Sequence, residues 1–157
     1  MKIGRLTASD RANAGTYDDL SGPEIEAAIE KAFVSRRIEW DRVLVPDEQP
    51  AIAEALRALA DEKCCQLIVT TGGTGPADRD VTPEATRSVI EKELPGFGEI
   101  QRMRTFDIAP TSILSRSTAG VRGRCLIVNL PGRPSAVREC LDVLCPAILK
   151  AIEILNP

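Results

Sequence analysis

The chain has 157 residues, of which 43% are hydrophobic and 27% are charged, and its formal net charge is −3. This length suits a single domain over residues 1–157, and the core must be mainly aliphatic because the chain contains only three Phe, one Trp and one Tyr. The negative net charge argues against a sequence-independent nucleic-acid binder, and the few aromatic residues argue against a platform for stacking single-stranded bases.

Strand and helix patterns alternate along the chain. Strands are predicted at residues 2–7, 37–45, 66–70 and 124–130, and helices at residues 23–33, 52–60, 83–93, 96–106 and from residue 134 onward. Ser21 and Glu24 form the pattern of a capping box at the first helix, and residues 112–123 are typical of an exposed loop. Pro146 is expected to kink or break the last helix before residues 148–155. The alternation predicts a three-layer α/β/α domain with a mostly parallel sheet.

The loops that follow parallel strands all leave from the same edge of the sheet. Their polar residues are therefore expected to converge on that edge. These residues are Ser9, Asp10 and Arg11, then Asp47 and Glu48, then Thr71 to Asp80, and finally Asn129 to Arg133. This edge is the predicted position of the functional site.

The absence of histidine restricts the chemistry that such a site can perform. It excludes Ser-His-Asp and Cys-His catalysis and histidine-ligated metals. A bound metal would be held by oxygen atoms, with Mg²⁺ as the first candidate. The five cysteines include no CxxC pair, so buried free thiols are the simplest interpretation. No apolar run approaches the roughly 20 residues of a membrane span, and the N-terminal segment lacks the apolar stretch of a signal peptide, so we expect a cytoplasmic protein.

A glycine-rich stretch, TTGGTGPADRDVTPEAT, follows the third predicted strand and begins at Thr70. Gly72, Gly73 and Gly75 permit positive φ angles and a close approach of the backbone to a ligand. Successive N–H groups in such turns form an anion-binding nest, and the helix expected from Pro83 adds the positive end of its dipole. A phosphate group is the ligand that this arrangement favours. A plain tight turn is the alternative, and the glycines alone do not decide between the two.

Acidic residues around this stretch extend the prediction from a phosphate site to a site for a phosphate together with a metal ion. The motif is not a Walker loop, because it lacks the lysine, and it is not GxGxxG, because Asp78 occupies the third glycine position. Carboxylates would repel a phosphate unless a divalent cation bridges the two. Asp80 in the stretch and Asp47 at the same edge therefore predict a magnesium–nucleotide site. For Asp10 and Asp78 a solvated surface acid or a helix cap is an alternative explanation.

Several segments resemble the molybdopterin adenylyltransferases, the MogA/MoaB-type proteins that also occur as the G domain of gephyrin. They are SDRANAGTYDDLSGP from Ser9, VPDEQ from Val45, TTGGTGPADRDVTPEAT from Thr70, LPGFGE from Leu94, APTSILSR from Ala109 and NLPGRP from Asn129. They occur in the family's order and span nearly the whole chain. The combination of TTGGTG, RDVTPEAT and LPGFGE is much more specific than any single glycine motif.

The resemblance implies a MogA-like fold and the adenylylation of molybdopterin by ATP with Mg²⁺, releasing pyrophosphate, in molybdenum cofactor biosynthesis. It also implies a homotrimer and a transient contact with the molybdenum insertase. By resemblance, Asp47 and Asp80 match the family's catalytic, metal-holding acids. Residues expected to bind the phosphates of nucleotide and pterin are Thr71, Gly72, Gly73, Thr74, Gly75, Asn129, Pro131 and Gly132. Residues expected to contact the substrates are Ser9, Asp10, Glu99, Ser112, Ser115 and Arg116.

The proposed chemistry does not need a histidine. The nucleophile would be the terminal phosphate of the substrate, whose second pKa of about 6 leaves it largely ionised near neutrality. Arg79 and Arg116 can act as phosphate-binding forks or remain solvated surface residues. Two alternatives stay open: a non-catalytic pterin-binding or scaffold module that has kept the cleft, and a nucleotide hydrolase.

Overall fold

A six-stranded sheet with the order β2-β1-β3-β6-β5-β4 forms the centre of the computed structural model, which describes residues 1–157. The strands are β1 (Lys2–Ala8), β2 (Glu39–Val45), β3 (Leu67–Thr71), β4 (Lys92–Glu93), β5 (Ala119–Arg122) and β6 (Cys125–Leu130). Strands β1, β2, β3 and β6 are mutually parallel, while β5 runs antiparallel to β6 and β4. The prediction of a mostly parallel sheet is confirmed.

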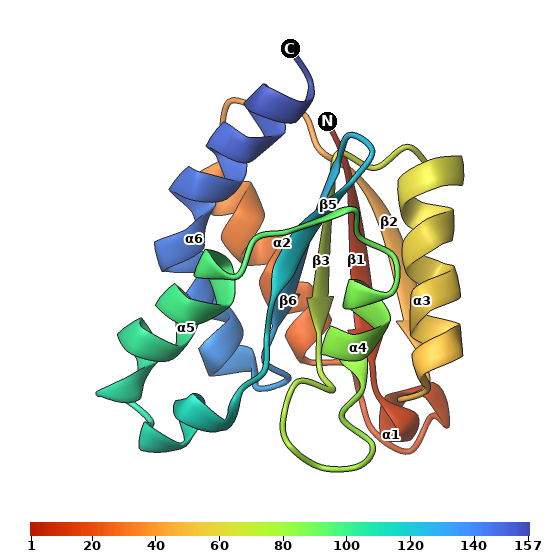
Figure 1. Cartoon of the computed structure of the whole chain (residues 1–157), viewed down its shortest axis with the longest axis vertical. Helices are drawn as coiled ribbons and strands as arrows, with labels where there is room; N and C mark the ends of the chain where they lie inside the picture. Colours follow the sequence, from red (N-terminus) through yellow and green to blue (C-terminus); the bar gives the residue numbers. More distant parts are fainter.

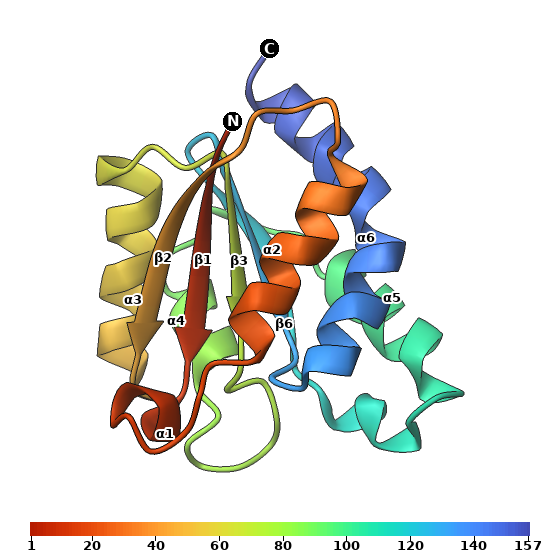
Figure 2. The same cartoon turned by 180° about the vertical axis from the view of Figure 1, so that it is seen from behind.

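Helices cover both faces of this sheet. They are α1 (Asp10–Asn13), α2 (Ser21–Ala32), α3 (Gln49–Arg57), α4 (Thr82–Arg87), α5 (Gly96–Phe106) and α6 (Pro134–Leu155). Helices α2, α5 and α6 lie against one face, and α3 and α4 lie against the other (Figures 1 and 2). The predicted three-layer arrangement is therefore confirmed. No helix combines the length and the apolar character that a membrane crossing requires.

Aliphatic side chains fill two hydrophobic clusters, one on each face of the sheet. In β3, Leu67 and Val69 belong to the cluster under α2 and α6, while Ile68 between them belongs to the cluster under α3 and α4. This alternation follows from the two-residue period of a strand. Every residue of β3 and β6 is buried, as expected for central parallel strands covered on both faces. Four of the five free cysteines are also buried, which agrees with the thiol interpretation.

Two expected helix features differ from the structure. Helix α2 begins at Ser21, and neither Ser21 nor Glu24 forms the capping box. Asp19 instead binds a free N–H group at the start of α2: its Oδ1 accepts the Gly22 N–H at 2.8 Å, and its Oδ2 accepts a hydrogen bond from Arg5. The helix predicted at residues 83–93 ends at Arg87, and the chain then enters the short strand β4.

Two further predictions, both in the C-terminal part of the chain, differ from the structure. The segment predicted as a loop, residues 112–123, instead contains the end of a 3₁₀ helix (Pro110–Leu114) and the whole of β5, which pairs with β6. Helix α6 continues through Pro146, so of the two expected outcomes, a kink or a break, the break is absent. Pro146 lies on the exposed side of α6, and the buried residues Cys145, Ile148 and Ile152 keep the helix packed on the sheet.

The four parallel strands end at nearly the same level. Ala8 is opposite Val45, and Thr71 is opposite both Thr7 and Leu130. The loops that follow these strands therefore emerge together, at the lower edge of the sheet in Figure 1. This register brings the segments after residues 8, 45, 71 and 130 to one place, as the sequence predicted.

Candidate active site

Two cavities lie at this edge, one on each side of the glycine loop, residues 72–80. The first, which we call the carboxylate cavity, has a volume of about 400 Å³ and is lined by Asp47, Asp80, Gly72 and Gly73 among others. The second, the serine cavity, has a volume of about 330 Å³ and is lined by Ser112, Ser115, Thr74 and Gly75 among others. Each volume is in the range of a small-molecule site.

The carboxylate cavity brings together the two acids that the sequence singled out. Asp47 follows β2 and Asp80 immediately precedes the α4 region, yet both line this one cavity. Partial burial raises the pKa of Asp47, and the charges of Asp10 and Asp80 raise it further. The hydrogen bond from the Asp10 amide acts in the opposite direction. Both carboxylates thus line the same cavity, as a shared cation site requires.

Asp10 supports Asp47 and does not line either cavity. The Asp10 amide donates to Asp47 Oδ2 at 2.9 Å, and the Asp47 amide donates to Asp10 Oδ1 at 3.0 Å. Arg79 pairs with the Asp10 carboxylate through an Nη2–Oδ2 distance of 2.7 Å, and this bond lowers the pKa of Asp10. Asp10 therefore positions Asp47, and its expected substrate contact stays a prediction, while Arg79 is engaged in the ion pair with Asp10.

The glycine loop passes very close to both carboxylates. Gly73 has a φ of +63°, and a Cβ atom on it would lie 2.5 Å from Thr82 Oγ1 and 3.3 Å from Asp47 Oδ1. A Cβ atom on Gly75 would lie 2.7 Å from Asp80 Oδ2. A side chain at Gly73 would be strained by the positive φ and would press on Thr82, and a side chain at Gly75 would displace the Asp80 carboxylate. The close approach that the structure shows is to the side chains of Thr82, Asp47 and Asp80, and the expected approach to a ligand stays a prediction.

Arg116 holds the glycine loop in place. Its Nε donates to the Gly75 carbonyl at 2.8 Å, its Nη2 donates to the Asp80 carbonyl, and its Nη1 pairs with Glu84. The Arg116 amide also donates to the Thr74 carbonyl at 2.8 Å. Arg116 thus connects the middle of this loop, at Thr74 and Gly75, to its last residue, Asp80. The sequence analysis placed Arg116 among the substrate contacts and missed this positioning role, for which the only signal is its place in a family motif.

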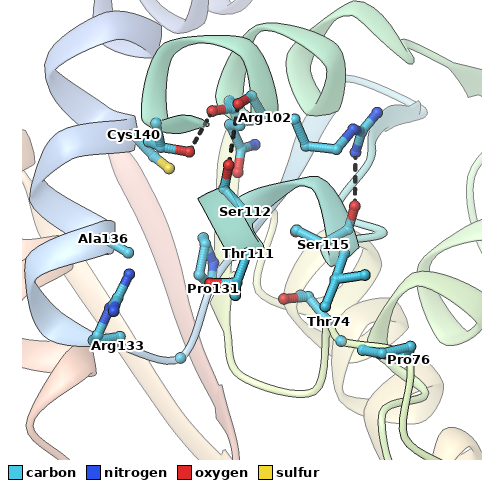
Figure 3. A pocket seen from close by; sticks show the side chains of 15 residues that line it. Thr74, Pro76, Arg102, Thr111, Ser112, Ser115, Pro131, Arg133, Ala136 and Cys140 are labelled. Carbon is cyan, nitrogen blue, oxygen red and sulfur yellow. Dashed lines mark hydrogen bonds between the residues drawn. The ribbon is translucent and has the colours of Figure 1, made fainter. Parts of the chain in front are cut away.

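The serine cavity is built between α5, the 3₁₀ helix and the start of α6 (Figure 3). Ser112 Oγ donates to the Arg102 carbonyl at 3.2 Å, and Arg102 Nη1 donates to the Ser115 carbonyl at 3.1 Å. The charged residues that line this cavity are Arg102 and Arg133, with no carboxylate. The carboxylate cavity is lined by Asp18, Asp47 and Asp80 together with Arg11 and Arg133. The two cavities therefore differ in electrostatic character.

Asn129 is fully buried and lines neither cavity, so the ligand contact expected for it stays a prediction without support from this geometry. Its Nδ2 donates to Thr70 Oγ1 at 3.0 Å and to Thr86 Oγ1 at 2.8 Å, which ties β6 to β3 and α4. Thr71 is also buried, and its hydroxyl donates to the Pro131 carbonyl at 2.7 Å. Through these hydrogen bonds, both buried residues hold the segments around Thr70, Thr86 and Pro131 in place.

The other expected site residues fall into three groups. Ser9, Gly72 and Gly73 line the carboxylate cavity, Thr74, Gly75, Pro131, Ser112 and Ser115 line the serine cavity, and Gly132 lines both. Glu99 lies exposed on the first turn of α5 and lines neither cavity, so its substrate contact stays a prediction without support from this geometry. Arg102 and Tyr17 also line the cavities but were not predicted as site residues; Tyr17 lies within the family segment that starts at Ser9, and Arg102 lies in none of the family segments.

The donor set of the carboxylate cavity suits Mg²⁺. No group of three or more His, Cys, Asp or Glu side chains is arranged to hold a metal ion. Asp47 and Asp80 supply two hard oxygen ligands in one cavity. Mg²⁺ is usually bound by one or two carboxylates, with substrate phosphates and water completing its octahedron. The pair is consistent with a cation that is held jointly by the protein and a nucleotide.

Comparisons with known proteins show which family the chain belongs to. Residues 4–150 match the family model described as a probable molybdopterin binding domain. The chain is 48% identical to a molybdopterin adenylyltransferase of Helicobacter pylori over 155 residues, which cover 99% of this chain and 88% of that protein. It is 49% identical to the Haemophilus influenzae molybdopterin adenylyltransferase over 142 residues, which cover 90% of this chain and 72% of that protein.

A solved structure supports the same relationship. The structure of the molybdopterin biosynthesis enzyme MoaB from Thermus thermophilus matches with a TM-score of 0.86 and 41% identity, covering 99% of this chain and 96% of that one. Sequence likeness and fold are thus in agreement. The chain therefore belongs to the molybdopterin-binding, MogA/MoaB-type family of molybdopterin adenylyltransferases, which act in molybdenum cofactor biosynthesis.

Proposed function

We propose that the protein is a molybdopterin adenylyltransferase, which joins the AMP part of ATP to the terminal phosphate of molybdopterin and releases pyrophosphate. The observation that carries this proposal is the pair of cavities that meet at the glycine loop, one acidic and one lined only by basic charged residues. A reaction between two phosphate-bearing substrates needs two such adjoining sites. The names of the relatives supply the identity of the substrates.

The different charges suggest which substrate occupies which cavity. The carboxylate cavity, with Asp47 and Asp80, fits a nucleotide that arrives with Mg²⁺, because the ion offsets repulsion between carboxylates and phosphates. The serine cavity offers Arg102, Arg133 and hydroxyl groups to a phosphate that arrives without a metal ion. We therefore assign the carboxylate cavity to ATP and the serine cavity to molybdopterin.

The roles of the residues in the reaction follow from this arrangement. The molybdopterin phosphate is already largely ionised near neutral pH, so the chain needs no general base and its task is to position charged groups. Arg116 and Asp10 hold Asp80 and Asp47 in their places, and the amides of the glycine loop would bind phosphate oxygens. Bound by the two carboxylates, Mg²⁺ would offset charge on the α-phosphate and the leaving pyrophosphate.

A direct assay tests the proposal. The purified protein is incubated with ATP, MgCl₂ and molybdopterin, and we expect adenylyl-molybdopterin and pyrophosphate in equal amounts. Omission of molybdopterin should abolish nucleotide turnover. Phosphate release without molybdopterin would indicate a nucleotide hydrolase instead. Calorimetry that detects molybdopterin binding but no binding of Mg-ATP would favour a non-catalytic binding module.

We also propose that the protein assembles as a homotrimer. Half of the exposed large hydrophobic side chains lie in the short segment 103–114, where they form what we call the α5 patch. It consists of Met103, Phe106, Ile108, Ile113 and Leu114. A concentration of apolar side chains on one surface is typical of a protein–protein contact. The α5 patch therefore supports a subunit interface on this side of the serine cavity.

Replacement of Ile113 by Glu is expected to convert the trimer into monomers. The Ile113 side chain is 65% exposed and lines neither cavity, so the change should add charge to the α5 patch without altering the site. Multi-angle light scattering would measure the mass. Val34→Glu is the matched control, because Val34 is 85% exposed and lies outside the patch. A monomeric wild type, or a trimeric Ile113→Glu variant, would contradict this assignment.

The product must pass to an enzyme that consumes it. We propose a transient contact with the molybdenum insertase in the cytoplasm, because an adenylylated intermediate is protected when it is transferred directly. Cross-linking of the two purified proteins during turnover would detect this contact. The absence of a cross-link that depends on both substrates would argue against it.

A further inference from the structure

The two cavities share only two lining residues, Gly132 and Arg133. Gly132 has no side chain, so Arg133 supplies the only side chain that lines both. A group at this junction can reach both substrates in the proposed reaction. Among all residues of the chain, Arg133 is therefore the one placed where the two phosphate groups would meet.

The backbone around Arg133 is held against the glycine loop. The Thr71 hydroxyl binds the Pro131 carbonyl at 2.7 Å, and a Cβ atom on Gly132 would lie 3.3 Å from the Gly72 Cα atom. Arg133 then forms the N-cap of α6, whose first hydrogen bond runs from the Val137 amide to the Arg133 carbonyl at 3.0 Å. The position of the Arg133 Cα atom is thus fixed by contacts on both sides.

The Arg133 side chain extends along the first turn of α6. In Figure 3 it lies beside Ala136, on the opposite side of the serine cavity from Thr74 and Pro76. It makes no capping hydrogen bond to the helix and is exposed. The guanidinium group is therefore free to turn toward a ligand at the cavity junction.

Other arginines near the site already have partners. Arg79 is paired with Asp10, and Arg116 is paired with Glu84. Arg102 donates to the carbonyl groups of Ser115 and Ser117, and Arg11 stacks on the Tyr17 ring with 4.8 Å to the ring centroid. Arg133 has no ion pair and no side-chain hydrogen bond in the structure. Its full charge and all five of its N–H donors remain available to a ligand.

We propose that Arg133 is a catalytic residue, which binds the phosphate groups through which the two substrates become joined. This inference rests on the proposed function. An oxygen of the molybdopterin phosphate forms a bond to the α-phosphorus of ATP, the bond from that phosphorus to the bridging oxygen breaks, and pyrophosphate leaves with the electron pair. Arg133 transfers no proton. Its planar guanidinium donates two parallel hydrogen bonds to oxygens whose negative charge is shared in the transition state.

Kinetics of Arg133→Gln and Arg133→Lys test this role. Arg133→Gln removes the charge, so we expect kcat for adenylyl transfer to fall about 100-fold, the usual effect of losing one transition-state donor, with little change in either KM. Arg133→Lys keeps the charge but not the two parallel donors, so its kcat should lie between those of the wild type and Arg133→Gln. Both variants should melt at the wild-type temperature, because the Arg133 side chain does not cap α6.

Arg138→Gln is the matched control. Arg138 lies on the same helix, is exposed and pairs with Glu24 at 2.7 Å, but it lines neither cavity. Its replacement should leave kcat and both KM values unchanged. The control separates the effect of losing a charge at the cavity junction from the effect of losing any positive charge on α6.

The outcomes distinguish this inference from the proposed function. If the wild type is active and Arg133→Gln retains its kcat, the catalytic role is overturned, even if one KM rises, because Arg133 would then bind only the ground state. A fall in kcat that Arg133→Lys partly restores supports the role. If the wild-type protein forms no adenylyl-molybdopterin at all, the proposed function fails and the role of Arg133 fails with it.

Discussion

Replacement of Asp80 by Asn is expected to lower the rate of adenylyl transfer by about 100- to 1,000-fold while the fold stays intact. Asp80 Oδ2 accepts the Ala77 amide at 3.0 Å, and the amide oxygen of Asn can accept the same bond. The substitution therefore removes the negative charge and leaves the local geometry in place. The loss should come from weaker binding of the cation and poorer compensation of phosphate charge.

Asp78→Asn provides the control for this experiment. Asp78 belongs to the same loop and is exposed, but it lines neither cavity, so its replacement should have no effect on turnover. The rate of adenylyl-molybdopterin formation is measured for both variants across a Mg²⁺ titration. If Asp80→Asn turned over at the wild-type rate at every Mg²⁺ concentration, Asp80 would have no role in holding the metal ion.

Replacement of Gly73 by Ala is expected to lower both stability and activity. The residue has a φ of +63°, and its new methyl group would lie 2.5 Å from Thr82 Oγ1. The left-handed conformation and the overpacking together should reduce the free energy of unfolding by about 2–4 kcal/mol. The methyl group would also lie 3.3 Å from Asp47 Oδ1, and a displacement of that carboxylate by about 1 Å can reduce turnover about 100-fold.

Gly123→Ala separates the backbone effect from the steric effect. Gly123 has a φ of +55° in the β5–β6 hairpin, at the opposite edge of the sheet, and no atom lies within 4 Å of its added Cβ. Its replacement should lower the free energy of unfolding by only about 1–2 kcal/mol, the effect of the left-handed conformation, and should leave adenylyl transfer unchanged. Urea denaturation measures the loss of unfolding free energy in each of the two variants. Equal losses of stability in the two variants would show that the Gly73 site relaxes around a methyl group.

Local patterns in the sequence were sufficient to predict most of the helices and strands. The two-residue and helical periods identified four of the six strands and all of the α-helices except the four-residue α1, because burial of apolar side chains follows these periods directly. The strand β5 was missed, because AGVR is short and its pairing with β6 is determined across a hairpin. The break expected at Pro146 did not occur, because packing of the buried face of α6 outweighs one missing hydrogen bond.

The sequence by itself also determined where the candidate site lies. Parallel strands require their following loops to share one edge, so Asp47 and Asp80 could be placed together without coordinates. Only the tertiary structure decided what each polar side chain at that edge contacts. Arg116 binds the Asp80 carbonyl from 36 positions along the chain, and Asn129 binds Thr70 and Thr86 inside the core. A hydrogen bond depends on distances of a few tenths of an ångström between segments remote in sequence, and a local pattern carries no information about such distances.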